Sequence, residues 1–301
     1  MRPRHLLPAI AALAVVTVGC AAPDDAGPSA ADAKDVTVTE LEKSDEIAAL
    51  LPADIREAGT VRVASGVSFP PMEFFDTDNT TVLGFDADLG RALGQVLGVE
   101  FEFHNTNFDG IIGGLEAGRF DLGLTSMIDK AERQEKVDFV DYLNSGVAFL
   151  VRKGNPEGLT EQLDLCGRTV AVEKSATGDI VADDISKECR AKGEEPIEEL
   201  PLPEQVATLQ ALSSGRADAV LALDLTLAYN VAQQPEQFEV PAEPFGLLPI
   251  GIPVPKDETE LRDAVQAALI EVQEQGVYAQ LLEKWNLADQ ALEGAPINTG
   301  Q

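Results

Sequence analysis

Residues 125–133 combine chemical groups that could hold a small carboxylate. The stretch reads TSMIDKAER and follows a strand-like run at residues 120–124. The hydroxyl groups of Thr125 and Ser126 can donate hydrogen bonds, as can free N–H groups at a helix start. The guanidinium group of Arg133 offers a planar fork that fits both oxygens of a carboxylate.

A helix start is predicted within the same stretch. Asp129 and Glu132 have the spacing of a capping box, which would begin a helix there and leave Arg133 in its first turn. The competing interpretation is a surface loop with an exposed arginine, and the stretch by itself does not exclude it.

A short internal repeat gives this stretch a counterpart. Residues 115–124 (LEAGRFDLGL) resemble residues 212–221 (LSSGRADAVL), and each copy reads as a helix end, a glycine stop and an apolar strand. Thr125 and Ser126 follow the first strand and Asp224 follows the second. Because ligands of open α/β sheets bind beyond the carboxyl ends of the strands, two similar lobes could face each other across a cleft. A match this short can also arise by chance.

The surrounding pattern alternates strands with helices. It predicts strands at residues 61–64, 100–104 and 169–172, and helices at residues 86–97, from about 174 towards 189, 261–269 and 278–285. Ser175 or Thr177 is the expected N-cap of the helix that starts near 174. The alternation favours an α/β fold with parallel sheets and helices on both faces.

Two lobes account for this order of elements. The expected divisions are a first part of lobe 1 at residues 46–147, lobe 2 at 148–248, and a return to lobe 1 with a C-terminal tail at 249–301. Two crossing strands near residues 147–151 and 247–254 would serve as the hinge.

The N-terminus resembles an export signal. Residues 1–20 have a basic start, an apolar run and a final Gly19-Cys20, as in a bacterial lipoprotein signal, although Thr17 stands where that motif usually has leucine. We expect lipid on Cys20 to anchor the protein to the outer face of the cell membrane, with residues 21–45 as a flexible tether. An ordinary secretory signal with an incidental cysteine is the alternative.

Charge and cysteine content narrow the partners. The formal net charge is −30, which disfavours binding to nucleic acid or to anionic lipid. In an exported protein Cys166 and Cys189 are expected to form a disulfide, with two free thiols as the alternative. The only histidines, His5 and His104, lack ligand-like spacing to these cysteines, so neither a metal site nor a cofactor is expected.

Several short motifs, in this order and spacing, resemble one protein family. They are SFPPMEF at residues 68–74, GFDADL at 84–89, FDGIIGGL at 108–115, Glu132-Arg133, VDF at 137–139 and GRADAV at 215–220. The region from about residue 60 to 287 is similar to the polar amino-acid-binding lipoproteins of bacterial ABC importers, extracellular solute-binding family 3. The cysteine pair looks like an actinobacterial subset of it.

The resemblance implies a two-lobed, periplasmic-binding-protein-like (type II) Venus-flytrap fold. Such a protein is a monomer that closes on a free amino acid and delivers it to the permease subunits of an ABC importer. In the family pattern Arg133 holds the α-carboxylate, together with Thr125 and the backbone N–H of Thr177. The α-ammonium is bound by Asp224 and Ser126. Aromatic walls are formed by Phe69 and Phe108, and the ligand side chain is contacted by Glu173. The structural alternatives are a surface ion pair for Arg133, a helix cap for Asp224, core packing for both phenylalanines and an exposed charge for Glu173.

Departures from the family pattern leave the ligand side chain open. Gly66 stands where relatives specific for basic amino acids commonly carry aspartate, whereas Glu173 favours a cationic or amide side chain. Ile128 replaces a usual hydroxyl residue near the carboxylate, and Ser175-Ala176 replace a usual Gly-Thr pair. Cationic, amide and acidic side chains all remain candidates.

Two other functions are compatible with this fold. Some relatives are exported cyclohexadienyl or arogenate dehydratases, whose chemistry needs a positioned acid or base, and here only Glu173 is an evident extra candidate. A ligand-sensing subunit that signals through a membrane partner is the other possibility.

Overall fold

The computed structural model describes residues 38–301. The expected signal peptide, the lipidation of Cys20 and most of the expected tether lie outside the described residues. No helix within residues 38–301 is long and apolar enough to cross a membrane.

A parallel sheet forms the centre of one half of the molecule. It has the strand order β5 (Glu100–Asn105), β1 (Thr60–Ser65) and β6 (Leu122–Gly123). The central strand is buried along its apolar side, with Val61, Val63 and Ala64 fully shielded from solvent. Helix α4 (Phe85–Leu97) covers this sheet and ends at Gly98, whose left-handed φ of 69° explains why a glycine stops it.

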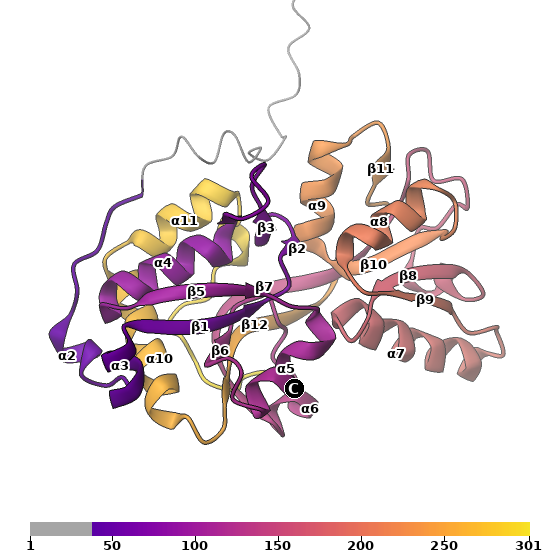
Figure 1. Ribbon diagram of the computed structural model, residues 1–301. Coiled ribbons are helices and arrows are strands. Elements are labelled where there is room, and N and C mark those ends of the chain that lie inside the picture. The colour runs from indigo at the N-terminus through magenta and orange to yellow at the C-terminus, as the bar shows by residue number, and fades with distance from the viewer. Residues whose placement is uncertain (1–37) are drawn as a thin grey trace, which may run out of the picture.

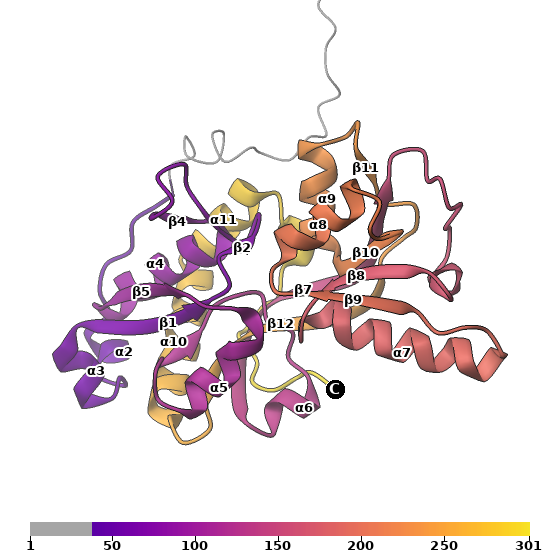
Figure 2. The ribbon, with the colours of Figure 1, turned by 45° about the vertical axis from the view of Figure 1, so that its right-hand side comes forward.

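A mixed sheet forms the centre of the other half. Its strand order is β11 (Phe238–Glu239), β7 (Val137–Arg152), β10 (Ala219–Leu223), β8 (Thr169–Glu173) and β9 (Glu198–Leu202). Strands β10, β8 and β9 are parallel, as predicted from the α/β alternation, whereas β7 runs antiparallel to β10. Helix α7 (Thr177–Lys192) lies on one side, and α8 (Gln205–Ser213) and α9 (Asp224–Gln233) lie on the other (Figures 1 and 2).

Two long strands connect the halves. β7 and β12 (Phe245–Pro255) pair antiparallel from Val147 opposite Phe245 to Val137 opposite Pro255. Both run through the middle of the molecule in Figure 1. They are the crossing strands expected from the sequence; β7 extends further towards the first sheet than predicted, whereas β12 nearly matches its predicted range.

Helices at the end of the chain return to the first half. α10 (Thr259–Glu274) and α11 (Val277–Trp285) pack against α4. Tyr278 donates a hydrogen bond of 2.5 Å to the carbonyl oxygen of Tyr142 in β7, and the indole of Trp285 donates one of 2.8 Å to Asp88 in α4. The returning helices therefore close the core of the half in which the chain began.

Shorter elements complete the fold. They are α2 (Asp45–Ala48), α3 (Ala53–Ala58), β2 (Ser68–Phe69), β3 (Glu73–Phe75), β4 (Val82–Leu83), η1 (Phe108–Gly110), α5 (Ile111–Glu116), α6 (Ala131–Gln134), η2 (Gln162–Leu165) and η3 (Ala288–Gln290). The expected disulfide between Cys166 and Cys189 is present and ties the segment after η2 to α7.

Both predicted helix caps are wrong. Helix α6 begins after Lys130 without a capping box, because the carboxylate of Asp129 accepts hydrogen bonds from the backbone N–H of Gly300 and the side chain of Gln134 instead. Helix α7 begins after Ala176 without a side-chain cap. The preceding residue, Ser175, has a positive φ of 63° and uses its N–H to bind Asp179.

Candidate functional site

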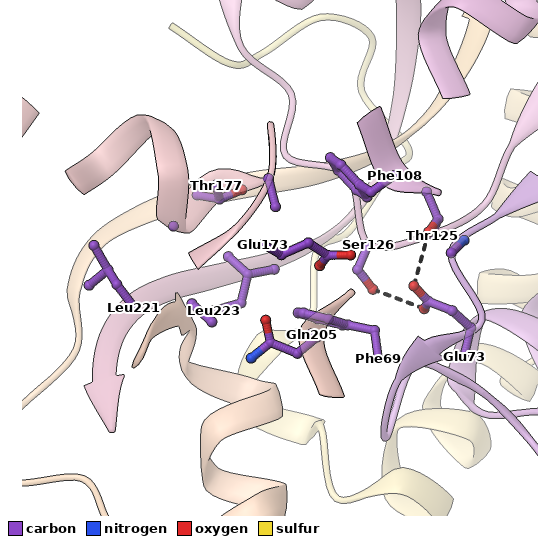
Figure 3. A pocket seen from close by; sticks show the side chains of 14 residues that line it. Phe69, Glu73, Phe108, Thr125, Ser126, Glu173, Thr177, Gln205, Leu221 and Leu223 are labelled. Carbon is purple, nitrogen blue, oxygen red and sulfur yellow. Dashed lines mark hydrogen bonds between the residues drawn. The ribbon is translucent and has the colours of Figure 1, made fainter. Parts of the chain in front are cut away.

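A pocket lies between the two sheets, where the carboxyl ends of β6, β8 and β10 approach one another. Its volume is about 410 Å³, including the open mouth. The residues that line it are Gly66, Phe69, Glu73, Phe108, Thr125, Ser126, Glu173, Ala176, Thr177, Gly178, Gln205, Leu221, Ala222 and Leu223 (Figure 3).

Hydroxyl groups from the loop after β6 form one side. The Thr125 hydroxyl accepts a hydrogen bond of 3.0 Å from the Gly66 N–H and donates one of 3.0 Å to Glu73. The hydroxyl of Ser126 lies 3.5 Å from the other Glu73 oxygen, and the backbone N–H of Ser126 donates to Asp86 at 2.9 Å. Both residues are buried and line the pocket. Their hydroxyl groups, which the family resemblance assigns to the ligand, are oriented by contacts with the carboxyl group of Glu73 behind them.

Glu73 and Asp86 form a buried carboxyl pair behind these hydroxyls. Asp86 also accepts a hydrogen bond of 2.8 Å from the Tyr142 hydroxyl. Burial and the charge of Asp86 raise the pKa of Glu73 well above its usual value, and burial raises the pKa of Asp86 to about 6. Burial and the charge of Asp86 therefore favour the protonated form of Glu73, since neighbouring like charges in a buried site do not both ionise readily.

Glu173 reaches into the pocket from the opposite side, at the end of β8. It is 6% exposed, and in the described part of the chain its carboxyl group has no hydrogen bond or ion pair. Burial, with the nearby charges of Glu204 and Asp109, raises its pKa to about 8. In Figure 3 its carboxyl group points towards the side formed by Thr125 and Ser126.

The first turn of α7 lies beside Glu173. Thr177 is the first residue of this helix and is buried, and the first N–H groups of a helix have no partner within it. Gly178 packs so closely on β10 that a Cβ atom there would lie 2.0 Å from the carbonyl oxygen of Leu221. The absence of a side chain at Gly178 is what brings the helix start to the pocket.

Apolar and amide groups close the remaining sides. Phe69 and Phe108 line the pocket, with Phe69 nearly buried and Phe108 partly exposed. Gln205, the first residue of α8, is 1% exposed, and its side-chain Nε2 has no hydrogen-bond partner among the described residues. Like Glu173, Gln205 is a polar group whose bonding capacity is unused at the pocket wall.

Arg133 lies behind Phe108 rather than in the lining. Its guanidinium carbon is 5.4 Å from the centre of the Phe108 ring. One terminal nitrogen donates to the Ile128 carbonyl oxygen at 2.8 Å and the other to the Ser175 carbonyl oxygen at 2.8 Å. Burial lowers the pKa of Arg133 to about 10, so the group stays cationic at neutral pH. The prediction of an exposed surface arginine is excluded by its 7% exposure.

Asp224 also lies just outside the lining, at the start of α9. Its carboxylate accepts hydrogen bonds of 2.6 Å from the Ser145 hydroxyl and 2.7 Å from the Leu225 N–H. Because the preceding residues 221–223 line the pocket, the carboxylate sits at its hinge side. One carboxylate oxygen of Asp224 thus accepts hydrogen bonds at the start of the helix, as a helix cap would. The other oxygen can still accept a hydrogen bond near the pocket.

Polar contacts join the two sides of the cleft. Besides the bond from Arg133 to Ser175, Lys174 forms an ion pair of 2.7 Å with Asp109, and the Thr226 hydroxyl donates a hydrogen bond of 2.6 Å to the Pro70 carbonyl oxygen. The two halves are therefore closed against each other.

Sequence reasoning missed part of this site. Glu73 and Asp86 belong to the motifs that carry the family resemblance, but only the structure shows that they lie side by side. Gln205 carries no sequence signal, because its neighbours read as an ordinary helix start. Within residues 38–301 no group of histidine, cysteine, aspartate or glutamate side chains could hold a metal ion.

Comparisons with known proteins agree with the fold. The arginine-binding protein ArgT of Corynebacterium glutamicum is 31% identical, over 84% of this chain and 83% of that protein, and the L-cystine-binding protein TcyJ of Escherichia coli is 28% identical, over 78% and 85%. A crystal structure of a mutant of ArgBP from T. maritima superposes with a TM-score of 0.71 and 31% identity, covering 77% of this chain and 97% of that one. The family model for bacterial extracellular solute-binding proteins, family 3, matches residues 61–288, and the chain belongs to that family.

Proposed function

We propose that this protein captures a free amino acid with a cationic side chain between its two lobes and delivers it to the permease of an ABC importer. The lobes are residues 46–147 with 249–301, and residues 148–248. The proposal includes a monomer held outside the membrane by lipid on Cys20. The observation that carries the choice of ligand is the buried, unpartnered carboxyl group of Glu173.

The main chain of the ligand is bound by groups from both lobes. Arg133, the Thr125 hydroxyl and the N–H of Thr177 bind the α-carboxylate. The terminal nitrogen of Arg133 that donates to the Ser175 carbonyl oxygen in this structure donates to a carboxylate oxygen of the ligand instead. Asp224 and Ser126 bind the α-ammonium. Since these groups come from either side of the cleft, a bound zwitterion stabilises the closed form more than the open one.

The side chain of the ligand meets only acidic and neutral groups. Glu73 and Glu173 line the pocket, and none of the lining residues within 38–301 is an arginine or a lysine. An acidic ligand side chain would find no cationic partner among these groups and could only meet carboxyl groups that stay protonated, whereas an ammonium or guanidinium group would favour the ionised form of Glu173 and could bind the oxygen of Gln205. The arginine-binding relatives support the same choice.

Binding without chemistry is part of the proposal. A catalytic function would require an acid or base held against the reacting atoms, and Glu173 is the candidate in the pocket that is free for this. In our assignment the carboxyl group of Glu173 binds the side chain of the ligand instead of acting as an acid or base. Turnover of a cyclohexadienyl compound by the purified protein would contradict this.

A thermal-shift screen against the twenty proteinogenic amino acids tests the proposal. At a ligand concentration about a hundredfold above Kd, binding adds about 2.7 kcal/mol, which raises the melting temperature by roughly 5–10 °C. Arginine or lysine should give the largest shift. A shift with none of the amino acids, or the largest shift with glutamate or aspartate, would contradict the assignment.

Two variants separate the two ends of the ligand in the same screen. Arg133→Lys loses the planar guanidinium group that can bind the Ile128 carbonyl oxygen and the ligand at the same time, and should reduce the shift for every amino acid that binds. Glu173→Gln should reduce the shift for cationic ligands by a binding loss of about 1.5–3 kcal/mol, typical of a charged hydrogen bond, and spare neutral ones. If Glu173→Gln responds as the wild type does, Glu173 does not recognise the side chain.

A further inference from the structure

The last residues of the chain run along β7 in the first half of the molecule. Residues 291–300, which we call the C-terminal strap, lie beyond the region matched by the family model. They form isolated bridges to β7, Ala291 with Leu143 and Ile297 with Val140. The N–H of Asp141 donates to the Pro296 carbonyl oxygen at 2.9 Å, and the Thr299 N–H donates to the Asp141 carboxylate at 3.2 Å. The strap therefore follows β7 through isolated bridges and single hydrogen bonds.

The end of the strap binds a buried carboxylate. The N–H of Gly300 donates to one oxygen of Asp129 at 2.7 Å, and the side chain of Gln134 donates to the other oxygen at 2.7 Å. The same Gln134 amide donates to the Gly300 carbonyl oxygen at 3.0 Å. Asp129 is fully buried, so loss of the strap would leave its charge without a main hydrogen-bond donor. Figures 1 and 2 both show the chain end, marked C, beside α6.

The contact at Gly300 has no space for a side chain. A Cβ atom there would lie 2.0 Å from the backbone oxygen of Asp129 and 2.8 Å from its Cγ atom. Because backbone meets backbone at this point, a single methyl group must push the strap and the loop apart.

Asp129 belongs to the loop that presents Arg133. The loop is held on its other side by β12, since the Asp129 N–H donates to the Pro249 carbonyl oxygen at 2.9 Å and Ile128 bridges Ile250. The carbonyl oxygen of Ile128, the residue before Asp129, accepts the 2.8 Å hydrogen bond from the Arg133 guanidinium. A chain of direct contacts thus runs from Gly300 through Asp129 and Ile128 to Arg133.

We propose that the C-terminal strap positions the loop of residues 125–133 for ligand binding, with Gly300, Asp129 and Gln134 as positioning residues. Ile128 stands where the family usually has a hydroxyl residue, so Arg133 binds the carboxylate with one donor fewer and depends more on its orientation. The strap, which lies outside residues 61–288 matched by the family model, holds the loop so that Arg133 keeps this orientation. The effect on binding rests on the proposed function, whereas the effect on the loop does not.

The test compares Gly300→Ala with Gln301→Ala in the purified protein. Gln301 is exposed and serves as the matched control. Titration calorimetry with arginine should show affinity about tenfold or more weaker for Gly300→Ala and unchanged for Gln301→Ala. Combination with Arg133→Lys should be less than additive, because both changes act through one guanidinium group. Wild-type affinity in Gly300→Ala, or full additivity, would overturn the proposal.

Hydrogen exchange separates this inference from the proposed function. Gly300→Ala should speed exchange of the amides in residues 126–133 relative to the wild type and to Gln301→Ala, whether or not any ligand binds. Unchanged exchange there would overturn the strap's role even if arginine binds the wild type. Gln134→Met, which removes the amide that joins Asp129 to Gly300, should have the same effects and replaces Gly300→Ala if that variant does not fold.

Discussion

Glu173 decides the chemistry of the pocket at the level of single residues. Its carboxyl group is buried among negative neighbours, and burial raises its pKa to about 8. Gly66 lacks the aspartate common in relatives specific for basic amino acids, but a Cβ atom there would meet the Thr125 hydroxyl at an ordinary 3.5 Å. A side chain at position 66 would thus begin without a clash, and in the proposed function Glu173, from the opposite lobe, supplies the negative charge in place of that aspartate.

The raised pKa of Glu173 predicts proton release on binding. At pH 7 the unliganded group is mostly protonated, and a cation beside it favours the ionised form, so binding should release a proton and affinity should increase as pH rises towards 8. Calorimetric titrations at pH 7 in two buffers of different ionisation enthalpy measure the release.

The control for this prediction is Glu173→Gln, which cannot release that proton. The buffer dependence should be larger in the wild type than in this variant. Equal buffer dependence in the two proteins would show that Glu173 does not ionise on binding.

The sequence predicted the residue types of the site better than their roles. Thr125, Ser126, Glu173 and Thr177 line the pocket, whereas their contacts with a ligand stay a prediction. The unpartnered amide of Gln205 could not be foreseen. Satisfaction of a buried polar group depends on neighbours distant in sequence, which no local pattern encodes.

Helix α7 is the element that brings backbone donors to the ligand. Its start is held against β10 by Gly178, where a Cβ atom would lie 2.0 Å from the Leu221 oxygen. The sequence predicted this helix from its apolar spacing but gave the wrong N-cap, since Ser175 adopts a positive φ and Asp179 binds its N–H. The strands and longer helices followed from periodicity, whereas helix ends depended on tertiary contacts.

Gly178→Ala should therefore displace the helix start. Overpacking of this kind costs about 1–3 kcal/mol, so the melting temperature should fall and arginine affinity should decrease about tenfold or more. Thermal unfolding and titration calorimetry measure the two effects.

Gly113→Ala is the matched control, because no atom lies within 4 Å of a Cβ atom at that helical position. It should raise stability by about 0.5–1 kcal/mol and leave affinity unchanged. Wild-type stability and affinity in Gly178→Ala would show that the close approach of α7 to β10 is not required.

At the scale of the whole molecule, the two halves meet through a few polar contacts and share two long strands. The ion pair of Lys174 with Asp109 and the hydrogen bond from Thr226 to Pro70 are exchanged for water when the cleft opens. The exposed Lys174–Asp109 pair contributes little, typically about 0–1 kcal/mol, whereas the Thr226 hydroxyl is buried. In the proposed function the ligand adds to the closure, because each of its charged ends binds groups from both lobes.

The most direct measurement is titration calorimetry of the purified protein with L-arginine and with L-citrulline, which has nearly the same shape but an uncharged side chain. Arginine is predicted to bind in the micromolar range or tighter, and at least about tenfold more tightly than citrulline, because only arginine provides the cation that Glu173 lacks. Equal or tighter binding of citrulline, or no binding of either, would contradict the capture of a cationic amino acid by this pocket.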